Sequence, residues 1–184
     1  MSRAVMLSIR PKWVEKIANG EKTIEVRKTR PKLAPPFKAY IYCTMPDAKD
    51  PHNILELHGA DGKIRKANGK VIGEFTCKGF IPFSHGRPCF VTGTPEEIER
   101  MACLSREEIW EYAPHGNPIG WRITDLVIYN TPRELTEFRM PCPNDLYCEA
   151  CAMYSNNGGI CNNGALPLRR PPQSWCYVEA MKDG

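Results

Sequence analysis

The sequence predicts an α+β protein, in which a small β-barrel has a few helices inserted between its strands. About six segments have the β-branched and aromatic composition, or the two-residue alternation, that is typical of strands. One early stretch has a helical period, and two short helices are expected near the middle of the chain. A strand-rich chain with helices between strands suits a small mixed barrel. Its 184 residues, 42% of them hydrophobic, are enough for one core, so we expect a single domain over residues 1–184.

The expected strands are spread along the whole chain. They cover residues 4–9, 23–27, 37–44, 70–83, 119–129 and 174–180, with a possible short strand at 54–57 and an exposed turn at 59–69. Gly73 and Gly79, inside the longest strand, indicate a bulge or a close approach of another backbone. In the strand at 119–129 we expect a bulge near Asp125. Alternation alone allows Glu74 to face either solvent or a cleft.

The first helix begins at Pro11, because proline suits the first helical position, where its missing N–H is not needed. Trp13, Val14 and Ile17 recur at helical spacing and form an apolar face. Gly20 ends this helix.

Two further helices are expected between about residues 95 and 112. Each begins with a capping box: Thr94 precedes Glu97 by three residues, and Ser105 precedes Glu108 by the same spacing.

The strand that follows the first helix has two unlike faces. Ile24 and Val26 point to one face, and Glu25 and Arg27 point to the other, close to Lys22. Charge alone favours a solvated face with a weak ion pair, worth ~0–1 kcal/mol.

Gly20, Lys22, Glu25 and Arg27 stand as G-x-K-x-x-E-x-R, which resembles the signature of the ASCH family, relatives of the PUA RNA-binding domain. The preceding LSIRPKWVEKI resembles that family too, and so do the later strands GWRITDLVIY and PPQSWCYVE. The resemblance does not extend over residues 141–168. It implies a PUA-like pseudobarrel, with the motif lining a cleft that meets RNA or a nucleotide.

A nucleic-acid-binding module needs donors for phosphates or base edges and an aromatic platform. Arg10, Lys22 and Arg27 supply donors, and Trp175 supplies either a platform or part of the core. Arg169 and Arg170 contact phosphate or are simply solvated. The residues expected to contact the RNA or nucleotide-like ligand are Ser8, Arg10, Lys22, Glu25, Arg27, Glu74 and Trp175.

An enzyme is the alternative. Small bacterial amidohydrolases that act on N4-acetylcytidine resemble this family and carry a catalytic lysine where Lys22 stands, partnered by a threonine and a glutamate. Here Glu25 occupies the threonine's position, so Lys22 and Glu25 would be the catalytic pair, with Glu99 or Glu74 as the glutamate. A catalytic lysine must lose its proton near neutral pH, and Glu25 favours the charged form. Binding is therefore preferred to hydrolysis.

Four of the nine cysteines are clustered, at Cys142, Cys148, Cys151 and Cys161. The close pair Cys148-x-x-Cys151 can supply two thiolates to one tetrahedral zinc, and the flanking pair can complete it. The intervening chain is rich in Asn and Gly and has little to bury, so a structural zinc would order it. We expect a Cys-rich insertion at residues 141–168 that holds this zinc. The alternative is a set of free thiols, and Cys176 is the substitute ligand.

Charge and hydropathy restrict the partners. The net charge of +4 permits nucleic acid without requiring it. No apolar run is long enough to span a membrane, and no signal core is visible, so we expect a cytoplasmic protein. A regulatory protein that docks partners through its cysteine segment is a third class. The kind of ligand and the oligomeric state stay open.

Overall fold

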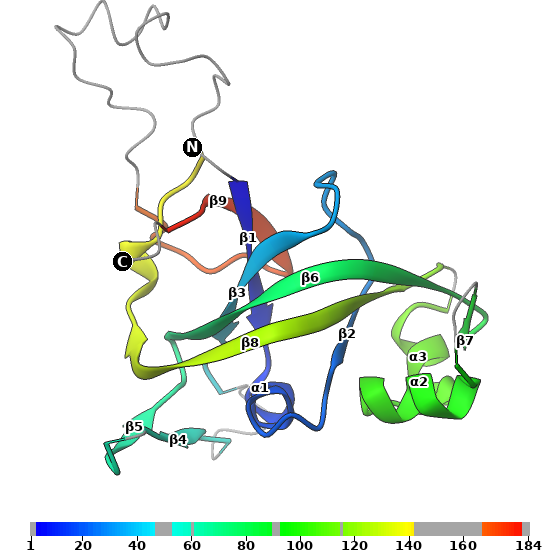
Figure 1. Ribbon diagram of the computed structural model, residues 1–184, viewed down its shortest axis with the longest axis horizontal. Coiled ribbons are helices and arrows are strands. Elements are labelled where there is room, and N and C mark those ends of the chain that lie inside the picture. Colours follow the sequence, from blue (N-terminus) through cyan, green and yellow to red (C-terminus); the bar gives the residue numbers. More distant parts are fainter. Residues whose placement is uncertain are drawn as a thin grey trace, which may run out of the picture.

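The computed structural model describes residues 3–46, 53–59, 61–89, 93–114, 116–141 and 167–181. The protein is an α+β fold with a mostly β core and a few helices, as the sequence predicts (Figure 1). Its main sheet has seven strands: β1 Arg3–Ile9, β2 Ile24–Arg27, β3 Phe37–Cys43, β6 Val71–Ser84, β7 Arg87–Pro88, β8 Ile119–Arg133 and β9 Trp175–Glu179. The expected Cys-rich insertion lies almost entirely outside the described residues.

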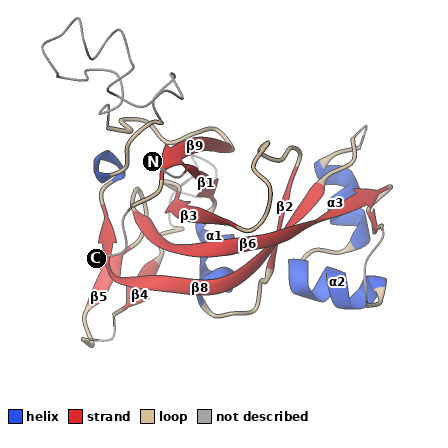
Figure 2. Cartoon of the chain, turned by 45° about the horizontal axis from the view of Figure 1, so that its top comes forward, coloured by secondary structure: helices blue, strands red, loops and turns tan. Residues whose placement is uncertain are grey.

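The strands of this sheet follow the order β2-β8-β6-β3-β1-β9, with β7 paired to the end of β6. β1 and β3 are parallel, and the other neighbours are antiparallel. The two longest strands, β6 and β8, run side by side across the molecule (Figure 2). In the strand order they lie between β2, at one edge of the sheet, and the group of β3, β1 and β9 on the other side.

The expected β-barrel is not closed in the part of the chain that is described. The edge strands β2 and β9 share no backbone ladder there. A side chain crosses the gap instead: Arg27 of β2 donates from Nη2 to the carbonyl oxygen of Ser8 at 2.8 Å and from Nη1 to that of Ser174 at 3.4 Å. The barrel is open, and an arginine joins its edges.

Three apolar clusters fill the fold. The first lies between the sheet and α1 (Pro11–Ala18), and it includes Val14, Ile17 and Trp121. The second lies on the other face of β1 and β3 and includes Tyr40 and Phe138. In the third, Ile24 and Val26 of β2 pack against two short helices. The apolar face of β2 therefore faces these helices, and its charged face turns to the first cluster.

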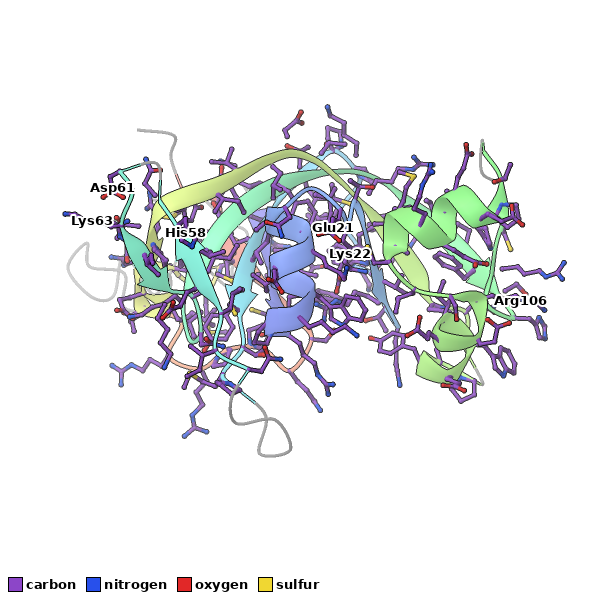
Figure 3. The ribbon with its side chains drawn as sticks, turned by 90° about the horizontal axis from the view of Figure 1, so that it is seen from below. Glu21, Lys22, His58, Asp61, Lys63 and Arg106 are labelled. Atoms are coloured by element: carbon purple, nitrogen blue, oxygen red, sulfur yellow. The ribbon has the colours of Figure 1, made fainter. Side chains whose placement is uncertain are left out.

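The two short helices are α2 (Pro95–Ala102) and α3 (Arg106–Tyr112). Both capping boxes predicted from the sequence are present: the side chains of Thr94 and Ser105 accept from the backbone N–H three residues later, and Glu97 and Glu108 reciprocate. Both helices lie at one end of β6 and β8, on the side of α1 opposite to the small hairpin described next (Figure 3).

The segment between β3 and β6 differs from expectation. The predicted strand at 54–57 lies at Glu56–His58 (β4), and the predicted exposed turn at 59–69 contains a second strand, Ile64–Lys66 (β5). The two pair as an antiparallel hairpin. Alternation at 64–66 is too short to be found in the sequence without its partner.

The end of β8 also runs further than predicted. It continues to Arg133 and is followed by a 3-10 turn, η1, at Leu135–Glu137. The bulge expected near Asp125 is present: the register with β6 shifts between Glu74 and Thr76, and Asp125 has a φ of 49°. Among the described helices, none is long and apolar enough to cross a membrane.

Candidate nucleotide-binding cleft

A cleft of about 1080 Å³ opens beside α1 and takes its walls from segments far apart in the sequence. Arg10, Lys12 and Trp13 contribute from the start of α1, and Glu108, Glu111 and Tyr112 from α3. The floor is formed by Lys22, Glu25 and Arg27, and the rim by Pro171, Pro172 and Gln173 ahead of β9. In Figure 3, Lys22 lies between α1 and the pair α2 and α3.

The floor is a buried ion network. Glu25 lies between two cations: its Oε1 is 3.0 Å from Arg27 Nη2, and its Oε2 is 3.6 Å from Lys22 Nζ. The side chains of Lys22, Glu25 and Arg27 are only 1%, 7% and 9% exposed. A solvated strand face is therefore excluded for this trio, which we call the floor triad.

Lys22 is held by neighbours from two other elements. Its Nζ donates to the carbonyl oxygen of Ala102 at the end of α2 and lies 4.9 Å from the ring centroid of Trp13. Burial lowers the pKa of Lys22 below its ordinary 10.5, although the nearby Glu25 and Cys103 act to raise it. Glu25 favours the charged form of Lys22, as expected, but desolvation by burial outweighs it.

Arg27 and Ser8 tie the floor to the edges of the open barrel. Besides its bonds to Glu25 and the two carbonyl oxygens, Arg27 keeps a buried Nε–H that has no acceptor among the described residues. Ser8, 8% exposed on β1, donates its hydroxyl to the carbonyl oxygen of Pro172 at 2.6 Å. Ser8 therefore lines the cleft while its hydroxyl is already occupied.

Tyr112 closes the cleft from the side of α3. Its ring lies 5.2 Å from Lys28 Nζ, and it is 39% exposed. Burial raises the pKa of the Tyr112 hydroxyl, which also senses the charges of Arg27, Glu25 and Arg10. A tyrosine ring on one wall and Trp13 on the other give the cleft two aromatic surfaces.

The structure brings five of the seven expected contact residues to this cleft: Ser8, Arg10, Lys22, Glu25 and Arg27. It does not bring Glu74 or Trp175 there. Glu74 on β6 pairs with Lys38 at 2.8 Å and accepts from Tyr129 at 2.7 Å.

Trp175 packs against Trp121 in the first cluster, with a centroid distance of 6.2 Å. Glu99, the other candidate glutamate, does not line the cleft either. Arg169 and Arg170 are exposed and lead directly into the rim at Pro171.

Apart from Arg10, the wall residues from α1 and α3 were not predicted as parts of the cleft. Trp13 was expected in the core, but it is half-buried and faces both Lys12, at 4.6 Å from its ring centroid, and Lys22. Tyr112 and Glu111 had no sequence signal, because only the packing of α3 beside β2 turns them to the cleft. Glu108 was noticed as a capping residue, and it both caps α3 and lines the wall.

The described residues contain no group of three or more His, Cys, Asp or Glu side chains placed to hold a metal. The four clustered cysteines lie outside those residues, so the zinc site stays a prediction. Five other cysteines, Cys43, Cys77, Cys89, Cys103 and Cys176, are free thiols.

An open β-sheet with α1 beside it and a charged motif on β2 defines an α+β protein with a mostly β core. Within it, residues 7–76 match the family model of the ASCH domain, which confirms the resemblance found in the sequence. The matched region covers less than half of the chain, and it contains the whole floor triad. No curated protein sequence matches the chain.

Solved structures agree on the fold. The crystal structure of ASCH from Zymomonas mobilis superposes with a TM-score of 0.54 at 16% identity, covering 96% of this chain and 87% of that chain. Two variants of that protein, with a tyrosine replaced by phenylalanine or a serine by alanine, give TM-scores of 0.52 and 0.56 at 16% identity. They cover 96% of this chain and 90% and 88% of their own. At this identity the likeness concerns the fold.

Proposed function

We propose that the cleft binds a nucleotide unit of RNA through the floor triad. The observation that carries the proposal is that three charged side chains are buried together at the base of an open cleft. Desolvating such ions costs several kcal/mol each, and well-packed apolar residues would serve folding equally well. A binding role explains why charge is placed there, and ASCH domains are generally associated with nucleic acids.

The charges of the cleft suit the two ends of a nucleotide. Arg10 and Lys12, both exposed at the start of α1, are placed to meet a phosphate. Glu25 can accept from the exocyclic amine of a base, and Arg27 can donate to base acceptors. Tyr112 and Trp13 offer ring faces for stacking, which single-stranded nucleic acids use widely.

Substitution of Lys22 by Met tests this proposal, because it removes the charge and keeps most of the volume. We expect roughly 10- to 100-fold weaker binding of ribonucleoside 5′-monophosphates, the range for losing a charge-assisted hydrogen bond. The matched control is Lys63→Met, in the hairpin turn away from the cleft, which should leave affinity unchanged. A folded Lys22→Met protein that binds as tightly as wild type would overturn the proposal.

The same measurement separates backbone from base recognition. If Lys22 meets a phosphate, its neutralisation weakens binding to every sequence and lowers the salt slope by about one phosphate contact. If Glu25 reads a base, Glu25→Gln changes the preferred base and leaves the salt slope alone.

Hydrolysis of an acylated nucleoside such as N4-acetylcytidine is the second candidate. Burial lowers the pKa of Lys22, which is the direction that a lysine acting as a general base requires. Water would add to the acetyl carbonyl, the bond from that carbon to N4 would break, and N4 would receive the proton. The products are acetate and cytidine.

Chromatography of N4-acetylcytidine incubated with the protein checks this candidate. Hydrolysis predicts release of cytidine by wild type and none by a folded Lys22→Ala protein. Absence of cytidine with wild type, at enzyme concentrations that bind the compound, would leave binding as the function.

A further inference from the structure

The chain carries a run of exposed positive charge directly after the floor triad. No acidic residue stands between Glu25 and Asp47. Within this stretch, Lys28, Arg30 and Lys32 are all exposed and form what we call the basic strip. None of the three contacts a carboxylate among the described residues.

Some other surface lysines of this protein pair with a neighbouring carboxylate. Lys16 lies 2.9 Å from Glu21, and Lys78 lies 3.0 Å from Asp125. The basic strip therefore differs from these sites in leaving its charge available to a partner.

Two hydrogen bonds anchor the loop that carries the basic strip to residues of β9. Trp175 donates from Nε1 to the hydroxyl of Thr29 at 2.9 Å, and the N–H of Lys32 donates to the hydroxyl of Tyr177 at 2.8 Å. Pro31, between Arg30 and Lys32, is buried. A loop held at these points presents its cations without a large loss of chain entropy on binding.

The basic strip begins at the cleft itself. Arg27, on the floor, is followed at once by Lys28, whose Nζ lies over the ring of Tyr112 on the cleft wall. Further on, the guanidinium of Arg30 lies 5.3 Å from the ring centroid of Phe80. Positive charge thus runs from the buried floor to the surface without interruption by an acidic residue of this segment.

We propose that the basic strip binds the phosphates of single-stranded RNA next to the nucleotide that enters the cleft. This inference rests on the proposed function and makes the ligand an oligonucleotide, not a free nucleotide. Cations without carboxylate partners suit a phosphodiester backbone. The bound RNA must be single-stranded, because a base can reach the buried floor only when it is unstacked from its neighbours.

Binding of labelled ligands of different length tests the inference. The ligands are a ribonucleoside monophosphate, a six-nucleotide RNA and the same sequence as duplex, each titrated at several salt concentrations by fluorescence anisotropy. The variant Arg30→Gln/Lys32→Gln removes two charges of the basic strip. The control Lys63→Gln/Lys66→Gln removes two exposed charges of the β4–β5 hairpin, and a thermal melt of each protein verifies folding.

For wild type we expect the six-nucleotide RNA to bind more tightly than the monophosphate or the duplex. The variant in the basic strip should bind it at least about tenfold more weakly, with a log–log salt slope smaller by about 1.4, since each single-strand contact contributes about 0.7. Its affinity for the monophosphate, and both affinities of the control, should not change.

Equal affinity of wild type for the monophosphate and the oligonucleotide, or an unchanged salt slope in the variant, would overturn the inference and leave the cleft proposal intact. Failure of wild type to bind either ligand would overturn both. Binding to vesicles of anionic lipid, without binding to the RNA, would assign the basic strip to a membrane surface and overturn the inference as well.

Discussion

At the scale of single residues, Glu25 stabilises the floor of the cleft by compensating the charges of two buried cations. It is the carboxylate that both Lys22 and Arg27 contact, and all three side chains are almost completely buried. Glu25→Gln leaves two buried cations without a counter-charge, and breaking a buried pair in this way costs about 3–5 kcal/mol. We expect a loss of that order in the free energy of unfolding, measured with urea.

Glu21 provides the matched control. It pairs with Lys16 at 2.9 Å, but it is exposed, so water screens the pair. Glu21→Gln should change the free energy of unfolding far less than Glu25→Gln. Equal, small losses in the two variants would mean that Glu25 is screened by solvent as well, and that the network is no special feature of the fold.

Lys22 gives the protein a distinct pH dependence. Because burial lowers the pKa of Lys22 in the folded state, the unfolded state binds more protons between that lowered pKa and 10.5. The stability that this residue contributes is therefore present above 10.5 and is lost as pH falls through the lowered pKa. Between wild type and Lys22→Met, we expect the difference in free energy of unfolding to move in favour of wild type as pH rises from 7 to 10.5. A difference independent of pH would contradict the lowered pKa.

At the scale of elements, the sequence predicted those features that depend only on residues close together in the chain. The helix Pro11–Ala18 and both capping boxes follow from residues within four positions of one another, and the structure confirms them. The face that β2 turns to the cleft could not be predicted by alternation alone. Alternation separates Ile24 and Val26 from Glu25 and Arg27, but only contact with α2 and α3 makes the charged face the inner one.

Gly73 and Gly79 were both singled out in the longest strand, and the structure distinguishes them. A Cβ on Gly73 would lie 2.3 Å from the carbonyl oxygen of Val127 on β8, while a Cβ on Gly79 would meet nothing nearer than 3.8 Å. We expect Gly73→Ala to lower the free energy of unfolding by about 1–3 kcal/mol, through overpacking between two backbones. Gly79→Ala, the control, should stay within about 0.5 kcal/mol of wild type. Similar free energies of unfolding for the two variants would show that β8 shifts to accommodate the added Cβ.

At the scale of the whole molecule, the sequence predicted an α+β fold and the match to the ASCH family model, but not that the barrel is open. Closure depends on whether β2 and β9, about 150 residues apart in the sequence, come close enough to form a backbone ladder. Strand composition carries no such information. The surroundings of Glu74 and Trp175 could not be predicted either. Each lies on an expected strand, but in the folded chain Glu74 pairs with Lys38 and Trp175 packs against Trp121, and neither lines the cleft.

The predicted zinc site also belongs to the scale of the whole molecule, because a bound metal would contribute to the free energy of folding of the protein. We expect about one equivalent of zinc per chain by elemental analysis of protein purified without chelator. Cys148→Ser/Cys151→Ser should lose it, since two of four thiolates are removed. Cys89→Ser/Cys103→Ser, which removes two half-buried free thiols, is the control and should retain it. Less than about a tenth of an equivalent in wild type, with all four cysteines reactive to a thiol reagent, would contradict the site.

The gap between the edge strands β2 and β9, which we call the seam of the open barrel, is bridged by Arg27. Arg27 reaches Glu25, Ser8 and Ser174 at once because a guanidinium presents several donors in one plane. Lysine keeps the charge beside Glu25 but has a single nitrogen, so Arg27→Lys loses hydrogen bonds that the guanidinium makes to the carbonyl oxygens of Ser8 and Ser174. Each such loss costs about 1–3 kcal/mol. We expect a lower free energy of unfolding and faster amide exchange at Ser8, whose N–H donates to the same carbonyl oxygen of Ser174 that Arg27 contacts. Arg122→Lys, on the neighbouring strand β8, is the control, and equal stability of the two variants would show that the seam is held by packing alone.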